Sequence, residues 1–259
     1  MESRNIPIRK KWGQNFLTDK NIIKTIISII NPSKNDLIIE IGPGRGALTM
    51  PLSQKVENIL AIEIDPLLTN FLINKNIPNL TLFNKDILDW NYSEIESKNK
   101  TVKLVGNLPY NITSPIIFKF LKNDFWDEMI IMVQKEVAKR ITSEFNCKNY
   151  SRISVICQTF FNISNELEVS HNSFFPIPKV DSSILKFKRK KNNLNIDEYS
   201  LFIKRCFAKR RKTMRNNLKD YLDVSQIHDY NNKRAQQISV EEFTNLFKKI
   251  YIWLKLNYS

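Results

Sequence analysis

Cysteine and histidine are scarce in this chain of 259 residues, which contains three of the first and two of the second. Cys147, Cys157 and Cys206 form no C-x-x-C pair, and His171 and His228 do not complete a set of metal ligands at a recognised spacing. The sequence therefore predicts structural thiols and no metal site.

Long hydrophobic runs are also lacking. No run approaches the roughly 18 uninterrupted apolar residues that a membrane helix needs. Residues Met1–Lys11 are basic and polar, have no apolar segment behind them and lack the pattern of a transit peptide. These absences favour a cytoplasmic protein that does not associate with a membrane.

Acidic residues are outnumbered. The chain has 26 Asp and Glu against 40 Lys and Arg, which gives a formal charge of +14. Such a charge favours a polyanionic partner, either nucleic acid or a membrane surface, although net charge also serves solubility. Composition alone does not choose between these explanations.

Short apolar runs alternate with helical patterns over residues 18–134, which indicates βαβ units and a mostly parallel sheet. Their apolar character is typical of strands covered by helices on both faces. The expected strands are Leu37–Ile41, Ile59–Ile64, Leu80–Phe83, Val102–Val105 and Met129–Val133. Two further β-rich runs, Ile153–Phe161 and Ser183–Phe187, suggest a hairpin at the sheet edge. A doubly wound α/β domain is therefore expected.

The pattern changes after the charged run Phe187–Asn193, because the periodicity from Asp197 onward is helical. The expected apolar face of this helical segment consists of Ile203, Phe207, Met214, Leu218 and Tyr221. Ser239 and Glu242 have the spacing of a capping box at the start of a last helix. The chain is long enough for two cores, so we expect an α/β domain over residues 1–190 and a small helical domain over residues 191–259.

Three of the five glycines fall in the segment Gly42–Gly46, between the first expected strand and a helix. A ligand could lie there, against the carboxyl end of that strand, although a turn without a ligand is the alternative. Glu63 ends the second strand about 20 residues later, where a carboxylate can bind ribose hydroxyls. The G-x-G-x-G spacing and Pro43 depart from the dinucleotide pattern and favour an adenosine ligand without phosphates. Asp86, after the third strand, can accept an adenine amino group or merely cap the next turn.

A polar and aromatic cluster, Asn107–Tyr110, follows the fourth strand. The Asn107 side-chain oxygen and the Leu108 carbonyl can accept hydrogen bonds from the two N–H groups of an amine such as adenine N6. Pro109 keeps Leu108 away from helical geometry. Tyr110 can stack on the base. Methyl transfer from a sulfonium to such an amine needs positioning more than a strong base. A simple turn is the alternative interpretation.

A second aromatic stretch, Ser173–Ser183, precedes the last expected strand and contains two prolines. Phe174 or Phe175 could face Tyr110 across the base, and Lys179 could contact a phosphate. A proline-stiffened loop with buried aromatics is equally compatible with this stretch. The sequence does not decide which of the two phenylalanines would meet the base.

Taken together, these motifs resemble the ribosomal RNA adenine dimethylase family, most closely its KsgA branch, over nearly the whole chain. The matching segments are Lys11–Leu17, Glu40–Gly46, Asn107–Tyr110, Phe175–Ser183, Ala208–Leu218 and Arg234–Phe243. Met214, Gln236 and Gln237 depart from the family pattern, outside the proposed active site. The resemblance implies a Rossmann-like, class I S-adenosylmethionine methyltransferase fold with a small all-helical C-terminal domain.

The resemblance also implies roles for the matching residues. S-adenosylmethionine would be the cofactor, and its pocket would be lined by Asn15, Leu17, Gly42, Glu63, Asp86 and Asn107. Asn107, Leu108 and Tyr110 would be the catalytic residues that hold the adenine. The implied reaction adds two methyl groups to N6 of each of two adjacent adenines in the 3′-terminal hairpin of 16S (small-subunit) ribosomal RNA, within an immature small subunit. The chain itself is expected to be a monomer.

The C-terminal region is rich in cations that could bind RNA, and Lys209, Arg210, Arg211 and Arg215 are expected to do so. We expect this segment to form a helix whose basic face lies roughly opposite its apolar face and can follow phosphates. That face would consist of Lys204, Arg205, Lys209, Lys212, Arg215 and Lys219. RNA affinity should then fall steeply with salt, whereas a merely solvated face is the alternative.

Three other functions fit parts of the sequence. Antibiotic-resistance methylases share the first and catalytic motifs but modify large-subunit ribosomal RNA. A non-catalytic RNA-binding or ribosome-assembly factor would keep the fold and lose site residues. An NAD-dependent dehydrogenase would need a phosphate-binding turn and a proton-transfer residue. The C-terminal match and the intact site residues favour catalysis on the small subunit.

Overall fold

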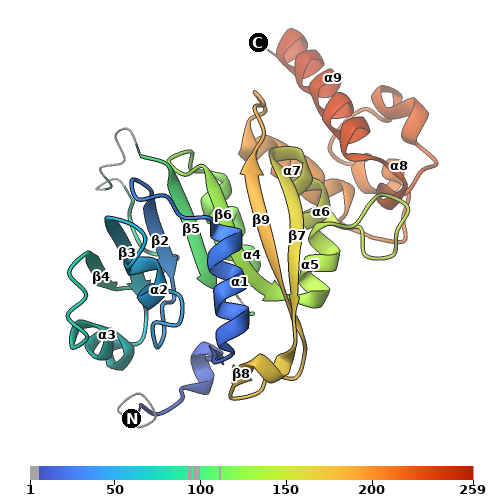
Figure 1. Ribbon diagram of the computed structural model, residues 1–259. Helices are drawn as coiled ribbons and strands as arrows, with labels where there is room; N and C mark the ends of the chain where they lie inside the picture. The colour runs from blue at the N-terminus through green and yellow to red at the C-terminus, as the bar shows by residue number, and fades with distance from the viewer. Residues whose placement is uncertain (1–5, 93–94, 96–99, 111, 259) are drawn as a thin grey trace. The chain divides into compact units, whose positions relative to one another are not determined.

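The computed structural model describes residues 6–92, 95, 100–110 and 112–258. In this part of the chain, the main feature is a seven-stranded sheet with the order β4-β3-β2-β5-β6-β9-β7 (Figure 1). Its strands are β2 Leu37–Ile41, β3 Asn58–Glu63, β4 Leu80–Asn84, β5 Val102–Asn107, β6 Glu128–Gln134, β7 Phe161–Val169 and β9 Ser182–Arg189. Strands β2 to β6 pair in parallel, whereas β9 pairs with β6 in the antiparallel direction. The five expected parallel strands are confirmed.

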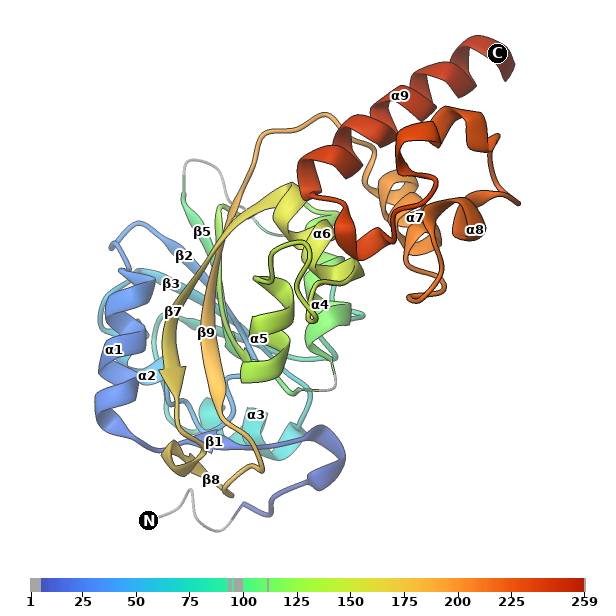
Figure 2. The same ribbon diagram turned by 90° about the vertical axis from the view of Figure 1, so that its right-hand side faces the viewer.

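Helices cover both faces of this sheet, as its apolar strands predict. Helices α1 (Lys20–Ile30) and α2 (Thr49–Ser53) lie on one face, and α4 (Thr113–Leu121) lies on the other (Figure 2). Helix α3 (Pro66–Ile73) packs next to β3 and β4. The doubly wound α/β architecture is therefore confirmed for the first part of the chain.

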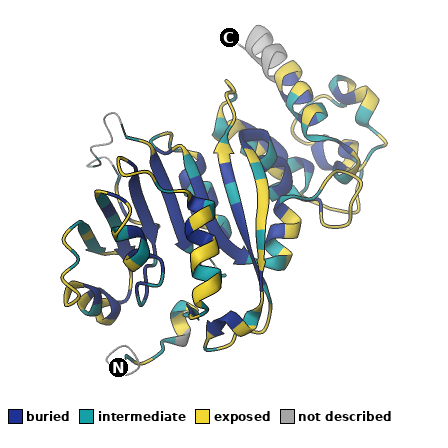
Figure 3. Ribbon diagram, in the orientation of Figure 1, coloured by how far each residue is buried: buried dark blue, intermediate teal, exposed yellow. Residues whose placement is uncertain are grey.

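The local sequence sets the limits of α1 and its packing. Asp19 caps its first turn by accepting hydrogen bonds from two backbone amides, and Asn31 ends it in left-handed geometry. Ile26, Ile27 and Ile30 belong to the same hydrophobic cluster as the buried Ile38 of β2. Each such side chain contributes about 1.5–3 kcal/mol on burial. Figure 3 shows β2 as buried along its length.

A separate two-stranded sheet joins distant parts of the sequence. Strand β1 (Phe16–Leu17) pairs in the antiparallel direction with β8 (Phe174–Phe175). The Ser173 carbonyl also accepts a hydrogen bond from the Thr18 amide, at 2.9 Å. The segment before α1 is therefore tied to the aromatic stretch that precedes β9.

Contacts divide the chain into two compact units, Met1–Ala138 with Ser164–Lys188 and Lys139–Ile163 with Arg189–Ser259. The helices of the second unit are α6 Arg152–Phe160, α7 Ile196–Cys206, α8 Met214–Leu218 and α9 Val240–Tyr258, and α5, Lys135–Ile141, crosses the division. Ser239 and Glu242 exchange side-chain to backbone hydrogen bonds of 3.1 and 2.8 Å, which confirms the predicted capping box. None of the helices in the described part of the chain has the length and apolar composition that a membrane crossing requires.

The prediction of a strand over Ile153–Phe161 is wrong, because most of this run forms α6. A capping box between Ser151 and Ser154 starts the helix. Its apolar residues are buried on more than one side, so the run lacks a helical period that would distinguish it from a buried strand. The edge strand starts only at Phe161, as β7, and it lies beside β9 in the sheet.

The expectation of one continuous helix beyond Asp197 is also wrong, because α7 ends at Cys206. The buried Asn217 stabilises the break: its Nδ2 donates to the Cys206 carbonyl at 2.8 Å, and its Oδ1 accepts from the Lys209 amide at 3.2 Å. The expected basic face is therefore not the face of one helix. Tyr221, expected on the apolar face, is 54% exposed, and the Arg205 guanidinium lies 4.2 Å from its ring centre.

Candidate active site

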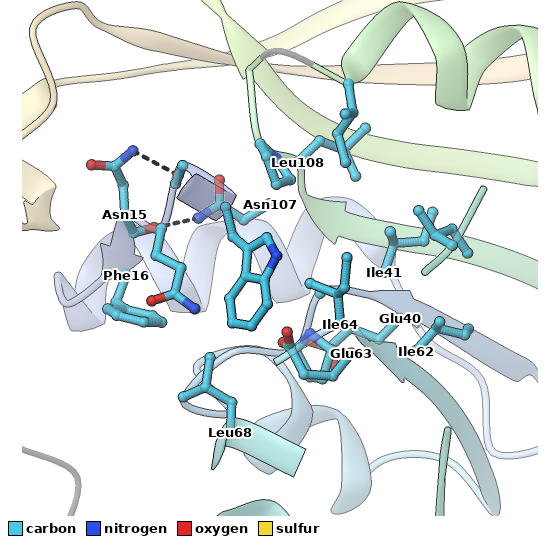
Figure 4. A pocket seen from close by; sticks show the side chains of 18 of the residues that line it. Asn15, Phe16, Glu40, Ile41, Ile62, Glu63, Ile64, Leu68, Asn107 and Leu108 are labelled. Carbon is cyan, nitrogen blue, oxygen red and sulfur yellow. Dashed lines mark hydrogen bonds between the residues drawn. The ribbon is translucent and has the colours of Figure 1, made fainter. Parts of the chain in front are cut away.

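A cavity of about 380 Å³ lies where β2, β3 and β5 end. The sheet continues to β3 on one side of β2 and to β5 on the other, so the chain reverses its winding at this point. Open α/β sheets bind ligands at such a position. Figure 4 shows side chains from the strand ends and from the N-terminal segment around the cavity, among them Asn15, Glu63 and Asn107.

Glycine keeps the turn after β2 open. Gly42 has a φ of +66°, and a β-carbon there would meet no other heavy atom within 4 Å. Positive φ favours glycine, and the empty side of the turn leaves room for a ligand. Gly106, at the end of β5, has a different purpose. A β-carbon there would lie 2.7 Å from the Ile41 carbonyl oxygen, so glycine lets β5 approach β2 closely.

Two carboxylates occupy the ends of neighbouring strands at the cavity. Glu63, which is almost fully buried, accepts hydrogen bonds from the amides of Gly44 at 3.0 Å and Asp65 at 2.9 Å. These bonds fix the carboxylate and leave lone pairs on both oxygens. Asp86 accepts from the Leu88 amide through Oδ1, at 2.8 Å, so it does cap the following turn. Its Oδ2 accepts no hydrogen bond from the described residues, and Asp86 also lines the cavity.

The N-terminal segment Lys11–Leu17 forms another wall of the cavity, and two residues that the sequence interpretation missed hold it. Gln14 Nε2 donates to Asp65 Oδ2 at 2.8 Å, and the Arg9 guanidinium lies 3.8 Å from the same buried carboxylate. Asp65 also caps α3. The segment containing Asn15 and Leu17 is therefore attached to the end of β3. The only available sequence signal was the position of Asp65 two residues after Glu63.

Asn107 presents a free acceptor to the cavity. Its Nδ2 donates to the Asn15 carbonyl oxygen at 2.9 Å, and this bond orients the amide group. Its Oδ1 accepts no hydrogen bond from the described residues. The Leu108 amide donates to the Met132 carbonyl at 3.2 Å, which fixes the peptide whose carbonyl oxygen is the second proposed acceptor. The geometry thus supports the pair of neutral acceptors that the sequence suggested.

The aromatic residues separate into exposed and buried ones. Tyr110 lines the cavity, and its hydroxyl lies 2.9 Å from Ser182 Oγ; burial raises the pKa of this phenol, so it is neutral near pH 7. Phe175 is 55% exposed, whereas Phe174 is 2% exposed and belongs to the hydrophobic core. Phe174 therefore cannot stack on a base without leaving the core, and Phe175 remains the candidate. Lys179 is exposed in the same loop.

Glu40 is a third carboxyl group at the cavity, and the sequence interpretation assigned it no role. It is 2% exposed, and its Oε2 has no hydrogen-bond partner among the described residues. Burial raises the pKa of Glu40 to about 7, while Thr49 lowers it and Glu63 raises it to smaller extents. A cationic ligand in the cavity would favour the ionised form. The donor set therefore fits an adenosine-containing ligand that carries positive charge.

The buried carboxyl of Glu40 should make the stability of the ligand-free protein depend on pH. Its pKa is about 7 in the folded chain and 4.5 in an unfolded one, so the folded state binds more protons between these values. The contribution of Glu40 to the free energy of unfolding should therefore fall by about 3 kcal/mol as the pH rises from 4.5 to 7. Glu40→Gln should remove this fall in urea unfolding experiments at pH 5 and pH 7.5. The exposed Glu57→Gln variant is the control, and a Glu40→Gln variant with the wild-type pH dependence would contradict the prediction.

The four C-terminal cations proposed for RNA binding belong to the second unit. Lys209, Arg211 and Arg215 are exposed. Arg210 is exposed as well, but its guanidinium donates to the Lys148 carbonyl and to the side-chain oxygen of Gln236. Arg210 therefore already has partners within its own unit, which the sequence did not indicate.

Comparisons with known proteins show which family the chain resembles. The family described as "Ribosomal RNA adenine dimethylase" matches residues 5–251. A "Ribosomal RNA small subunit methyltransferase A" of Francisella tularensis subsp. novicida (strain U112) is 42% identical over 252 residues, which is 92% of this chain and 95% of the relative. The protein of the same name from Wigglesworthia glossinidia brevipalpis is 44% identical over 254 residues, which is 94% of this chain and 97% of the relative.

Two solved structures share the fold. A dimethyladenosine transferase from Plasmodium falciparum has a TM-score of 0.80 at 23% identity, and the similarity covers 92% of this chain and 98% of that one. The 23S rRNA methyltransferase ErmE has a TM-score of 0.72 at 24% identity, and the similarity covers 91% of this chain and 99% of that one. The fold is accordingly that of the class I methyltransferases.

The family match extends over both units and includes every segment that lines the cavity. The fixed carboxylate of Glu63, the open turn at Gly42 and the unpaired oxygen of Glu40 fit the adenosine and the positive charge of the family's methyl donor. The chain therefore belongs to the ribosomal RNA adenine dimethylase family, and its cofactor is S-adenosylmethionine.

Proposed function

We propose that this chain dimethylates N6 of two adjacent adenines in the 3′-terminal hairpin of 16S (small-subunit) ribosomal RNA. The curated relatives described above are named for the small ribosomal subunit. The observation that carries the proposal is the orientation of Asn107. Its nitrogen is bonded to the Asn15 carbonyl, so its oxygen remains at the cavity as an acceptor beside the Leu108 carbonyl.

The strand ends hold the methyl donor. When bound, S-adenosylmethionine supplies an electrophilic methyl group on a sulfonium that leaves as a neutral thioether. The Glu63 carboxylate would accept hydrogen bonds from the ribose hydroxyls, Asp86 Oδ2 would accept one from the amino group of the cofactor's adenine, and Gly42 would leave space at the turn. Asn15 and Leu17 close the cavity from the N-terminal segment. Glu40 favours positive charge in the cavity through its buried carboxyl.

The residues after β5 hold the acceptor. Asn107 Oδ1 and the Leu108 carbonyl oxygen each accept a hydrogen bond from one N–H group of the substrate amine. These two hydrogen bonds turn the lone pair of the amine toward the methyl carbon. Both acceptors are neutral, and the reaction needs no strong base because the leaving group is good. Tyr110 stacks on one face of the extruded adenine, and Phe175, from the aromatic stretch Ser173–Ser183, covers the other face. Base–aromatic stacking of this kind is worth about 1–3 kcal/mol.

We assign the two functions to two domains, catalysis to residues 1–190 and recognition of RNA to the helical residues 191–259. Lys209, Arg211 and Arg215 bind phosphates in this assignment, and Lys179 does so near the active site. The substrate is an immature small ribosomal subunit, and the enzyme acts as a monomer in the cytoplasm. The high positive charge of the chain supports an RNA partner.

The test is a labelling experiment with purified protein and S-adenosylmethionine that carries a radioactive methyl group. Immature small subunits and large subunits are incubated separately, with Asn107→Ala as the matched inactive variant, and the labelled nucleosides are identified. We expect dimethyladenosine in small-subunit RNA only. Label in large-subunit RNA would support a resistance-type methylase, and no label in either particle would support a binding factor.

A further inference from the structure

The Tyr110 ring is held by a buried hydroxyl group. The Tyr110 hydroxyl lies 2.9 Å from Oγ of Ser182, and Ser182 has no exposed surface. Tyr110 itself is only partly buried, and it lines the cavity. The hydrogen bond therefore joins the tip of a ring on the active-site wall to a fixed point in the protein interior.

The backbone of Ser182 is fixed on both sides. Ser182 starts β9 and pairs with Gln134 at the end of β6. The preceding residue, Asp181, accepts a hydrogen bond through its carbonyl from the Lys135 amide at 3.0 Å. The Asp181 carboxylate accepts another from the His171 amide at 3.0 Å, and its Oδ1 lies 2.7 Å from His171 Nδ1. These contacts fix the backbone from which the Ser182 hydroxyl reaches Tyr110.

The sheet also places Tyr110 and Ser182 on a common support. Strand β6 pairs with β5 on one side and with β9 on the other, and Met132 of β6 is opposite both Asn107 and Ile184. The Met132 carbonyl also accepts a hydrogen bond from the Leu108 amide. The segment that carries Tyr110 and the strand that starts at Ser182 are thus both attached to β6.

We propose that Ser182 is a positioning residue for methyl transfer, which holds the Tyr110 side chain in place on the active-site wall against the substrate adenine. This proposal rests on the proposed function, in which Tyr110 stacks on that base. A tyrosine side chain on a cavity wall can swing about its Cα–Cβ bond, and the hydrogen bond at its hydroxyl restricts this swing before the base arrives. Preorganisation of this kind lowers the cost of placing the reacting amine.

The test is a double-mutant cycle with Ser182→Ala, Tyr110→Phe and the combined variant, measured as kcat/KM for RNA at saturating S-adenosylmethionine. Tyr110→Phe keeps the stacking ring and removes its hydroxyl. Each single variant should lower kcat/KM by about 5- to 10-fold, the range of one ordinary hydrogen bond. The combined variant should be no worse than either single one, because all three remove the same bond. The KM for S-adenosylmethionine should not change.

Ser183→Ala is the matched control, because Ser183 is the next residue, is equally buried, and its hydroxyl has no partner among the described residues. It should stay within twofold of the wild type. The proposal is overturned if the two single effects multiply in the combined variant, or if Ser183→Ala loses as much as Ser182→Ala. Failure of the proposed function looks different, because the wild-type protein itself would then not methylate small-subunit RNA.

Discussion

Asn107→Ala is expected to lower kcat for RNA methylation by about 10²–10³-fold, the range found when one preorganised polar contact is removed from a reacting centre. The substitution removes the acceptor Oδ1 and also the hydrogen bond from Nδ2 to the Asn15 carbonyl. The first loss leaves one N–H bond of the substrate amine without a partner. The KM for RNA should change far less, since most of the binding energy comes from phosphate contacts elsewhere.

Single-turnover methylation of a small-subunit substrate, followed at saturating concentrations of both reactants, measures this effect directly. Asn70→Ala is a suitable control because Asn70 is an exposed residue of α3 whose side chain makes no hydrogen bond in the described structure. An Asn107→Ala variant within fivefold of the wild-type rate would exclude the proposed role of Oδ1. A fall in affinity for S-adenosylmethionine of the same size as the fall in kcat would assign Asn107 to cofactor binding instead.

The affinity for RNA is expected to fall about 10³-fold between 50 and 200 mM salt, as for a protein that binds roughly six phosphates. Six exposed cations from the last turn of α7 to the residue after α8 could supply this binding: Lys204, Lys209, Arg211, Lys212, Arg215 and Lys219. Arg205 and Arg210 are left out of this set, because one stacks on Tyr221 and the other has hydrogen-bond partners within the protein.

A fluorescence titration of labelled hairpin RNA over this range of salt gives the slope of log affinity against log salt. Combined alanine substitution of Lys209, Arg211 and Arg215 should reduce the slope by about three, or about one for each phosphate that the variant no longer neutralises. Lys55→Ala is the control, since Lys55 is exposed and lies just before β3 begins, at the opposite end of this strand from the cavity. A nearly salt-independent affinity would contradict the assignment of this region to RNA.

The parallel strands could be predicted because both of their faces are buried, so each appears in the sequence as a short apolar run between polar turns. Their carboxyl ends then placed Glu63, Asp86 and Asn107 at one edge of the sheet without any knowledge of side-chain contacts. Helix α6 could not be predicted in this way, because a short run of buried apolar residues has the same pattern in a strand and in a helix. The break after α7 could not be predicted either, since the reason is one buried side chain, Asn217, that bonds to backbone groups before it in the sequence.

The site was less predictable where it depends on three-dimensional contacts. Nothing in the pair Phe174 and Phe175 tells which one the core buries, because the answer comes from the alternation of side chains in β8. The attachment of Gln14 to Asp65 and the bond from Tyr110 to Ser182 join residues that are far apart along the chain. Glu40 looked like an ordinary strand residue until its burial and its unpaired oxygen were known.

The pairing of β1 with β8 has a consequence for how the protein is made. Phe16 finds its partner only at Phe175, and the segment before Phe16 forms a wall of the cofactor cavity. During much of translation, β1 is already made and β8 is not, so the segment that forms this wall is not yet held in place. The newly made protein should therefore become able to retain its cofactor only late in translation, once Phe175 has left the exit tunnel.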